Sequence, residues 1–417
     1  MTRRRPRPEL PRALSLEALA RELARLDGAR RVFLPMGAGE PLALHAAFAE
    51  APGTAAGLTF VGVPLAGINE TDWTALDPSV RFETTMLSPA LAAAHARGAA
   101  RILPLHYREI PRWLRADPVD AAIAHVATPQ RFALSSDLAP AAFAHARLRV
   151  LLVNAAMPDI PDAPAIALDD VDIIARCDVP LAEAAPAPAD AVGAIARSVA
   201  DLVEDGDVIQ IGVGRLPGAI AAALGTKRHL KVHSGLLSAA HIALIEAGAI
   251  ADAPGALTAG AILADAHATR RLAADPRVRL RPVEFTHDQS VLGAIARFTS
   301  INAALEVDLM GQVNAEFVGD RQIAGVGGMA DFVRGAAAAP GGRAIIALAA
   351  AGKDGTSRIV PRLASPAVTL SRADAPIIVT EYGSADLRRL DAVARAEALI
   401  AIAAPAARAS LRAHLNG

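Results

Sequence analysis

The feature that most constrains this chain is a repeated alternation of short apolar runs with helix-like segments. Two of the clearest examples are RRVFLPMGAGEP and DVIQIGVGRLPGAIAAAL, each typical of a strand, a glycine-rich turn and the start of a helix. Strands that are apolar throughout and alternate with helices belong to parallel sheets that are covered on both faces. The pattern therefore predicts an α/β fold with mainly parallel sheets.

Two such series lie on either side of a segment rich in proline and alanine. PLAEAAPAPAD, residues 180–190, shows little periodicity and is the best linker candidate. A chain of 417 residues is longer than one ordinary core accommodates. We therefore predict two α/β domains, residues 1–185 and 186–417. In the second domain, RLRPVEF is predicted to be a strand, and ALEVDLMG is predicted to pair with QVNAEFVG.

Charge and cysteine content exclude several classes of function. Lys plus Arg (42) nearly balances Asp plus Glu (43), so the overall field favours neither nucleic acid nor a membrane surface as a partner. A small-molecule partner fits better. The single cysteine, Cys177, excludes a disulfide framework and a cysteine-based zinc site and is typical of a reducing cytoplasm.

The basic start, MTRRRPRPELPRAL, is not followed by a continuous apolar segment. We interpret it as a solvated tail rather than a signal peptide. Later apolar segments are interrupted by charge or proline and fall short of the roughly 18 residues that a spanning helix needs. The sequence thus predicts a soluble cytoplasmic protein that has no membrane partner.

Two glycine-rich turns are candidates for ligand binding. In QIGVGRLPGAI, Gly212 and Gly214 follow a strand and precede a helix, where backbone N–H groups can approach an anion. The motif has neither the third glycine of a dinucleotide fingerprint nor the Gly-Lys-Ser/Thr of a P-loop. A tight turn without a ligand is an equally good interpretation.

The second turn lies in IAGVGGMADFVRGA, where Gly325, Gly327 and Gly328 precede an amphipathic segment. Such a loop can direct successive N–H groups at one oxygen, as a developing thioester oxyanion requires. Close packing of the backbone explains the glycines equally well.

Titratable residues also occur at the ends of predicted strands. His233 and His287 are positioned for acid or base chemistry, although a structural role explains each of them as well. Glu381 is a candidate base, and a hydrogen bond to a neighbouring turn is the alternative interpretation. No cluster of His, Asp and Glu has the spacing of a zinc site, so no metal is predicted.

Several motifs together resemble the acetyl-CoA hydrolase/4-hydroxybutyrate CoA-transferase family. In the second half they are DGDVIQIGVGRLPGAI, EAGAI, INAALEVDLMGQVNAEFVGDRQIAGVGGMADFVRGA, GGRAIIALAAAGKDGTSRIVPRL and APIIVTEYGSADLR, and the match is nearly continuous over residues 301–411. The first half resembles the family through MGAGEP, RGAARILPLHYREIPRWL and VNAAMPDIP.

The resemblance implies two tandem NagB/RpiA-like domains of the class I CoA-transferase type, usually in a homodimer or a higher homo-oligomer. It implies an acyl-CoA thioester as substrate, a carboxylate as acceptor and no permanently bound cofactor. Family members work by a ping-pong reaction in which an enzyme glutamate attacks the thioester and then carries CoA. The loop at residues 325–328 would supply backbone donors near the thioester oxygen, and Lys353 would meet a CoA phosphate.

The stretch KVHSGLLS departs from this family at its reactive position. Family members have His-Thr-Glu there, and the glutamate is the nucleophile, whereas this chain has His233, Ser234 and Gly235. Glycine has no carboxylate, so the covalent intermediate of the family cannot form at position 235. Two further departures are THDQS, with His287 in place of the family's asparagine turn, and VATPQRFALSSD, which replaces the family's Ser/Pro-Pro-Asp-x-x-Gly loop.

Three functions remain open from the sequence. A CoA-transferase would need a substitute nucleophile such as Glu70, Glu284 or Glu316. An acyl-CoA hydrolase would use His233 or His287 to activate water and Ser234 to orient it. The third is a CoA-binding protein without turnover, held to CoA by the glycine loop and Lys353. In the first two cases, the family resemblance implies a role in acetate metabolism.

Overall fold

The structure is a computed structural model that describes residues 10–184 and 193–415. Its contacts divide the chain into two compact units. Unit 1 comprises Met1–Ala185, Gly235–Leu237 and Thr258–Thr286, and unit 2 comprises Pro186–Ser234, Ser238–Leu257 and His287–Gly417. Residues 1–9 of the basic tail and residues 185–190 of the linker candidate lie outside the described residues. The domain boundary at residue 185 stays a prediction.

Unit 1 contains an eight-stranded sheet in the order β1-β8-β7-β6-β2-β3-β4-β5, in which every neighbouring pair is parallel. Its strands are β1 (Arg12–Leu14), β2 (Arg31–Phe33), β3 (Thr59–Val61), β4 (Arg81–Thr84), β5 (Ala100–Ile102), β6 (Ala121–Val126), β7 (Leu148–Asn154) and β8 (Ile173–Cys177). The interpretation of the whole start as a solvated tail was wrong for residues 12–14. They form β1 because their backbone hydrogen-bonds to the edge strand β8.

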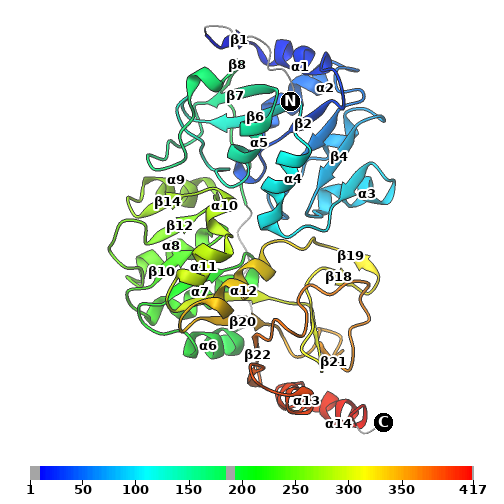
Figure 1. Cartoon of the computed structure of the whole chain (residues 1–417), viewed down its shortest axis with the longest axis vertical. Coiled ribbons are helices and arrows are strands. Elements are labelled where there is room, and N and C mark those ends of the chain that lie inside the picture. The colour runs from blue at the N-terminus through cyan, green and yellow to red at the C-terminus, as the bar shows by residue number, and fades with distance from the viewer. Residues whose placement is uncertain (1–9, 185–192, 416–417) are drawn as a thin grey trace. The chain divides into compact units, whose positions relative to one another are not determined.

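Both faces of this sheet are buried under helices. Val32 packs into the core that contains residues of α1 and α2, whereas its neighbour Phe33 packs with α4 and α5 on the opposite face. Figure 1 shows α5 across strand β6. The helices are α1 (Leu16–Ala24), α2 (Leu42–Glu50), α3 (Ala92–Ala96), α4 (Ile110–Ala116) and α5 (Ala139–His145), with short 3₁₀ turns η1 (Gly37–Gly39), η2 (Trp73–Ala75), η3 (Pro89–Leu91), η4 (Tyr107–Glu109) and η5 (Leu168–Asp170). This two-sided burial explains why the strands are apolar at successive residues.

The second eight-stranded sheet has the order β14-β12-β10-β9-β15-β20-β22-β23. The pairs β10–β9, β9–β15, β15–β20 and β20–β22 are parallel, and β22–β23 is antiparallel. Its strands are β9 (Val208–Ile211), β10 (Lys231–His233), β12 (Leu257–Ala259), β14 (Val278–Leu280), β15 (Phe298–Ala303), β20 (Arg343–Ala347), β22 (Ile377–Thr380) and β23 (Gly383–Asp386). The predicted α/β class with mainly parallel sheets is confirmed.

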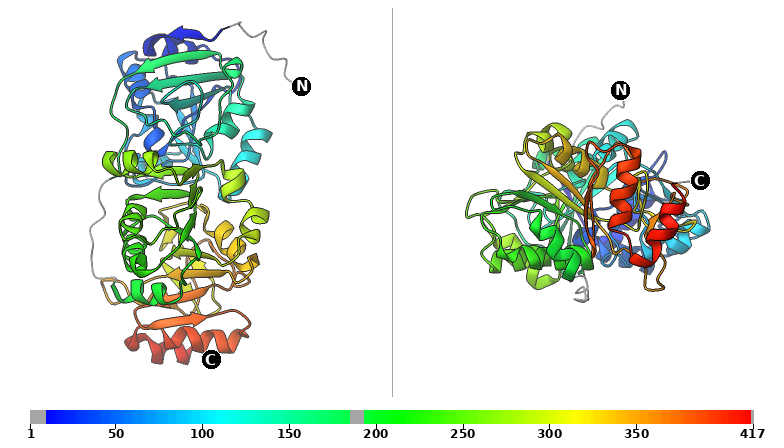
Figure 2. Two further views of the ribbon diagram at one scale, coloured as in Figure 1. Left: turned by 90° about the vertical axis from the view of Figure 1, so that its left-hand side faces the viewer. Right: turned by 90° about the horizontal axis from the view of Figure 1, so that it is seen from below.

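The remaining helices follow the strands in the predicted alternation. They are α6 (Gly193–Asp201), α7 (Arg215–Ala223), α8 (Ala239–Glu246), α9 (Ala266–Ala274), α10 (Val283–Thr286), α11 (Gln289–Ala294), α12 (Met329–Ala338), α13 (Ala392–Ala401) and α14 (Pro405–Ala413), with the 3₁₀ turn η6 (Leu224–Thr226). Helices α13 and α14 contact each other, and α13 packs on β23, as Figure 2 shows. None of the helices in the described ranges is long and apolar enough to cross a membrane.

Two short segments test the finer predictions. β16 (Glu306–Asp308) pairs antiparallel with β17 (Val313–Asn314), which confirms the pairing of ALEVDLMG with QVNAEFVG. RLRPVEF, by contrast, leaves its strand at Leu280, and the next residues form α10. Pro282 causes this change because proline cannot donate to a strand ladder and favours the start of a helix. The other short strands are β11 (Leu236–Ser238), β13 (Ala261–Leu263), β18 (Phe317–Val318), β19 (Arg321–Gln322) and β21 (Ile359–Val360).

Candidate functional site

Three neighbouring strand ends of unit 2 bring polar side chains to one edge of the sheet. β9 lies between β10 and β15, and all three are parallel, so their carboxyl ends meet at the same edge. His233 ends β10, Gly212 follows β9, and Asn302 is the second-last residue of β15. Open α/β sheets bind their ligands at such edges. The structure thus joins His233 to a glycine turn that lies well before it in the sequence.

A buried pair of amides forms the floor of this edge. Asn302 Nδ2 donates to Gln210 Oε1 at 3.0 Å, and Gln210 Nε2 donates to Asn302 Oδ1 at 3.3 Å. A Cβ on Gly212 would lie 3.8 Å from Asn302 Oδ1, and Gly214 has a φ of +122°, which favours glycine. Sequence reasoning missed Gln210 and Asn302. The available signal was an amide inside each of two otherwise apolar runs.

The glycine loop at residues 325–328 packs against His287. A Cβ on Gly328 would lie 2.6 Å from His287 Nε2, which is closer than any side chain could sit. The imidazole also lies beside the Phe332 ring of α12, with 4.5 Å between ring centroids. His287 and Gly328 were predicted separately, and the structure brings them into contact.

The same loop is tied to the backbone before it. Gly327 has a φ of +60°, so glycine suits its left-handed conformation. The carbonyl of Glu316 accepts hydrogen bonds from the N–H groups of Ile323 at 2.8 Å and Ala324 at 3.3 Å. Gln322 Nε2 donates to Ala324 O at 2.8 Å. These hydrogen bonds hold the chain just before the loop.

Electrostatics make His287 a neutral side chain. It is buried, and burial, followed by the charge of His233, lowers the pKa of His287 to about 3. Aromatic contacts extend this packing, since His233 lies 6.1 Å from Phe298 and Phe298 lies 6.4 Å from Phe332 between ring centroids. A group whose pKa is about 3 is a weak base at neutral pH.

The other predicted site residues of unit 2 differ in their surroundings. Ser234 is buried, and its hydroxyl donates to Ile211 O at 3.5 Å. Lys353 is exposed in a turn, and no contact in the described part of the chain joins it to the loop at residues 325–328. The carboxylate of Glu381 accepts a hydrogen bond from the Ala350 N–H at 2.9 Å, which is the turn contact considered from the sequence.

The three glutamates considered as substitute nucleophiles lie in unlike settings. Glu70 and Glu284 are exposed. Glu316 is buried, and Thr369 Oγ1 donates to its Oε1 at 2.8 Å. Burial raises the pKa of Glu316. Exposure sets the first two apart from the buried third.

Unit 1 places Gly235 beside residues to which the sequence analysis gave no role. The carbonyl of Gly235 accepts hydrogen bonds from the N–H groups of Gly260 at 3.0 Å and Ala261 at 3.2 Å. A Cβ on Gly260 would lie 2.7 Å from Asp137 Cβ and 3.1 Å from Gly235 O, so only a glycine fits between them. Asp137 accepts a 2.5 Å hydrogen bond from the Tyr107 hydroxyl.

Asp137 and Tyr107 line a small pocket in unit 1. Its wall includes Met36 and Gly37 of MGAGEP and also Leu65. The N–H groups of Gly37 and Leu65 each donate to Asn69 Oδ1 at 2.9 Å. The lining residues are Phe33, Leu34, Pro35, Met36, Gly37, Val63, Leu65, Tyr107, Ser135, Asp137, Leu138, Ala139, Ala261 and Ile262. In the sequence, Asp137 is the last residue of VATPQRFALSSD, which was noted only as a departure from the family's loop, and its place in the pocket was missed.

No group of three or more His, Cys, Asp and Glu side chains in residues 10–184 and 193–415 could hold a metal ion. The polar groups at the strand ends of unit 2 and in the pocket of unit 1 are instead amides, imidazoles, hydroxyls and a carboxylate. Such groups suit binding and acyl transfer.

Comparisons with known proteins identify the family and the fold. The family described as "Acetyl-CoA hydrolase/transferase C-terminal domain" matches residues 267–415. The 4-hydroxybutyrate coenzyme A transferase of Clostridium kluyveri is 33% identical over 404 residues, covering 93% of this chain and 94% of that protein. The succinyl-CoA:cyclohexane-1-carboxylate CoA transferase of Geobacter metallireducens is 36% identical and covers 80% of each chain. The crystal structure of RipA from Yersinia pestis superposes with a TM-score of 0.86 at 26% identity and covers 97% of both chains.

Proposed function

Because this chain belongs to the acetyl-CoA hydrolase/transferase family, we propose that it transfers coenzyme A from an acyl-CoA thioester to a carboxylate. The structural observation that carries the proposal is the contact of Gly328 with His287, which holds a glycine loop against the imidazole of His287. A loop of this kind aims backbone N–H groups at a developing oxyanion. The nearly full-length likeness to a 4-hydroxybutyrate CoA transferase supports the reaction class.

The proposal gives each predicted residue of unit 2 a role. Gly325, Gly327 and Gly328 bind the thioester end of CoA, and Gly212 and Gly214 approach it from the neighbouring strand ends. Lys353, which is exposed, binds a CoA phosphate. His233, Ser234 and His287 surround the reacting carbonyl, where a neutral His287 can donate one N–H but accepts a proton poorly.

The low pKa of His287 argues against its use as the base of a hydrolase. A hydrolase that used His287 to activate water would need an imidazole whose pKa lies near neutrality. At a pKa of about 3, His287 would hold the proton taken from water only weakly. A carboxylate acceptor is already a nucleophile and needs no such base.

Finer properties belong to the same proposal. The acceptor is a small carboxylate, since the two transferases above carry the names of 4-hydroxybutyrate and cyclohexane-1-carboxylate. The protein acts in the cytoplasm as a homo-oligomer, in the simplest case a dimer, and holds no permanent cofactor. The boundary between its two domains lies near residue 185 of the sequence.

An exchange assay tests the reaction class. Purified protein is mixed with acetyl-, propionyl-, butyryl- or succinyl-CoA and labelled acetate, and the thioesters and free CoA are followed by mass spectrometry. The proposal predicts that label enters the CoA thioester with little free CoA. Release of free CoA without exchange would instead establish a hydrolase. If neither labelled thioester nor free CoA forms, the protein binds CoA without turnover.

A further inference from the structure

The proposed function leaves unit 1 with an unsolved chemical requirement. The resemblance places the nucleophilic glutamate of the family at position 235, where this chain has glycine. Transfer by a ping-pong route requires a carboxylate that can carry CoA between the two half-reactions. A substitute should therefore lie close to Gly235.

Asp137 meets this requirement by position. One point, the Cβ position of Gly260, lies 2.7 Å from Asp137 Cβ and 3.1 Å from the Gly235 carbonyl oxygen. Asp137 Cβ and the Gly235 carbonyl oxygen therefore both lie close against Gly260. All three residues belong to unit 1. Among the glutamates considered earlier, Glu284 is exposed, whereas Asp137 is half-buried in the pocket wall.

The hydrogen bonding of Asp137 suits a reactive carboxylate. The Tyr107 hydroxyl donates to its Oδ2 at 2.5 Å and so orients the group within the pocket. Burial raises the pKa of Asp137, which makes the ionised carboxylate more basic than an exposed one. Burial, together with the neighbouring charge of Asp137, raises the pKa of Tyr107 well above its usual value, so the phenol stays a donor.

We propose that Asp137, oriented by Tyr107 and placed beside Gly235 by Gly260, is the carboxylate that carries CoA in this protein. The inference rests on the proposed CoA transfer and adds the residue that performs it.

The steps balance without any further reactant. An oxygen of Asp137 attacks the thioester carbonyl carbon, the C–S bond breaks, and CoA leaves as a thiolate, which gives a mixed anhydride. The thiolate attacks the Asp137 carbonyl carbon, and the original acyl group leaves as a carboxylate, which gives an aspartyl-CoA thioester. The acceptor carboxylate then collects CoA by the same two steps in reverse.

Mapping the intermediate tests the proposal on the unmodified protein. The whole protein is incubated with propionyl-CoA alone, its intact mass is measured, and the adduct is located by peptide mass after proteolysis. We expect CoA on the peptide that contains Asp137. An adduct on any other residue would overturn the proposal while leaving CoA transfer intact.

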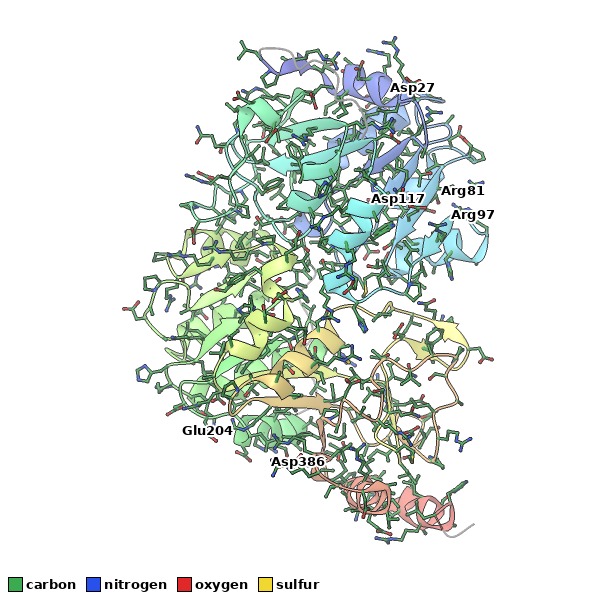
Figure 3. The ribbon with its side chains drawn as sticks, viewed as in Figure 1. Asp27, Arg81, Arg97, Asp117, Glu204 and Asp386 are labelled. Carbon is green, nitrogen blue, oxygen red and sulfur yellow. The ribbon has the colours of Figure 1, made fainter. Side chains whose placement is uncertain are left out.

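Variants extend the test to rates. Asp137→Asn keeps the size of the side chain and should lose the adduct and at least about 1,000-fold of the exchange rate. Tyr107→Phe should keep the adduct on Asp137 but form it more slowly. Asp27→Asn, at an exposed carboxylate of the same unit that Figure 3 labels, is the matched control and should behave as the unmodified protein.

The failures are distinguishable. Unchanged exchange in Asp137→Asn, with circular dichroism showing a retained fold, would overturn the role of Asp137 only. Absence of exchange in the unmodified protein would overturn the proposed transfer and, with it, the role of Asp137 as nucleophile.

Discussion

The imidazole of His287 lies so close to the backbone of Gly328 that a methyl group on residue 328 would sit 2.6 Å from Nε2. His287 is itself buried against Phe332, so it cannot yield without moving a core aromatic ring. This contact fixes the loop and the imidazole together. It makes the glycine at position 328 a requirement of shape.

Gly328→Ala should therefore damage activity more than the fold. We expect the exchange rate to fall about 100-fold, because a displacement of about 1 Å at reacting groups has that effect. The unfolding free energy should fall by about 1–3 kcal/mol through overpacking. Labelled-acetate exchange and denaturant unfolding measure the two quantities.

Gly218→Ala is the matched control for this substitution. No atom lies within 4 Å of the Cβ position of Gly218, which is inside α7. Alanine there should leave exchange unchanged and raise the unfolding free energy by up to about 1 kcal/mol. Full activity in Gly328→Ala would contradict the packing argument.

Replacing Asp207, a buried carboxylate of unit 2, should lower the stability of the protein. Its side chain is fully buried at the start of β9 and accepts hydrogen bonds from Arg297 Nε at 2.8 Å and Arg343 Nη1 at 3.0 Å. Asp207→Asn should lower the unfolding free energy by about 2 kcal/mol, a value reduced because both arginines are partly exposed.

The exposed pair of Asp386 with Arg388 provides the comparison. Their side chains approach to 2.7 Å with nearly half of each surface exposed, and Figure 3 labels Asp386. Asp386→Asn should change the unfolding free energy by less than about 1 kcal/mol. Equal losses in the two variants, measured by urea unfolding, would contradict the account.

His125 should make stability depend on pH. Burial lowers the pKa of His125 to about 4, although its Nδ1 lies 3.0 Å from Gly39 O. In the unfolded chain this pKa is about 6.5, so the unfolded state binds a proton that the folded state excludes. The unfolding free energy should fall as pH drops from 6.5 toward 4, by about 1.4 kcal/mol per pH unit for this residue.

His125→Leu should remove that part of the slope. Denaturant unfolding between pH 5 and 7.5, a window set by the pKa values of His125 above, measures it for both proteins. His241, whose pKa burial also lowers to about 4, remains in both and serves as an internal reference. Identical slopes would mean that His125 titrates normally in the folded protein.

A rescue experiment tests the relation between Asp137 and position 235. Gly235 is not among the glycines with a positive φ, so its backbone conformation does not itself require glycine. In an Asp137→Asn background, Gly235→Glu should restore exchange and shift the CoA adduct to residue 235, seen by peptide mass. Gly235→Ala is the control and should restore nothing. If the glutamate variant also stays inactive, the pocket does not accept a carboxylate at that position.

Much of the fold could be predicted from local patterns. The strand at Val208–Ile211 and the turn at Gly212 follow from an apolar run bounded by glycines, and the buried sheet confirms them. RLRPVEF was misassigned at its end because Pro282 starts a helix that the apolar residues alone do not reveal. The family resemblance supplied the reaction class, which no local pattern contains.

The site was less accessible because its contacts join distant segments. Nothing local to THDQS indicates that His287 touches Gly328, or that burial there lowers the pKa of its imidazole. Asp137 was missed for a related reason. Asp137 ends VATPQRFALSSD, which the sequence marks only as a departure from the family's loop, and only the fold brings it to Gly260.

The most direct test of CoA transfer is to run the reaction in H₂¹⁸O with propionyl-CoA and acetate and to measure the mass of the released propionate. In transfer, the new oxygen of propionate comes from the enzyme carboxylate, which in turn takes an oxygen from the acceptor acetate. The propionate should therefore carry no solvent oxygen while acetyl-CoA accumulates. Propionate that gains one solvent oxygen for each CoA released would contradict the account, because water would then be the acceptor.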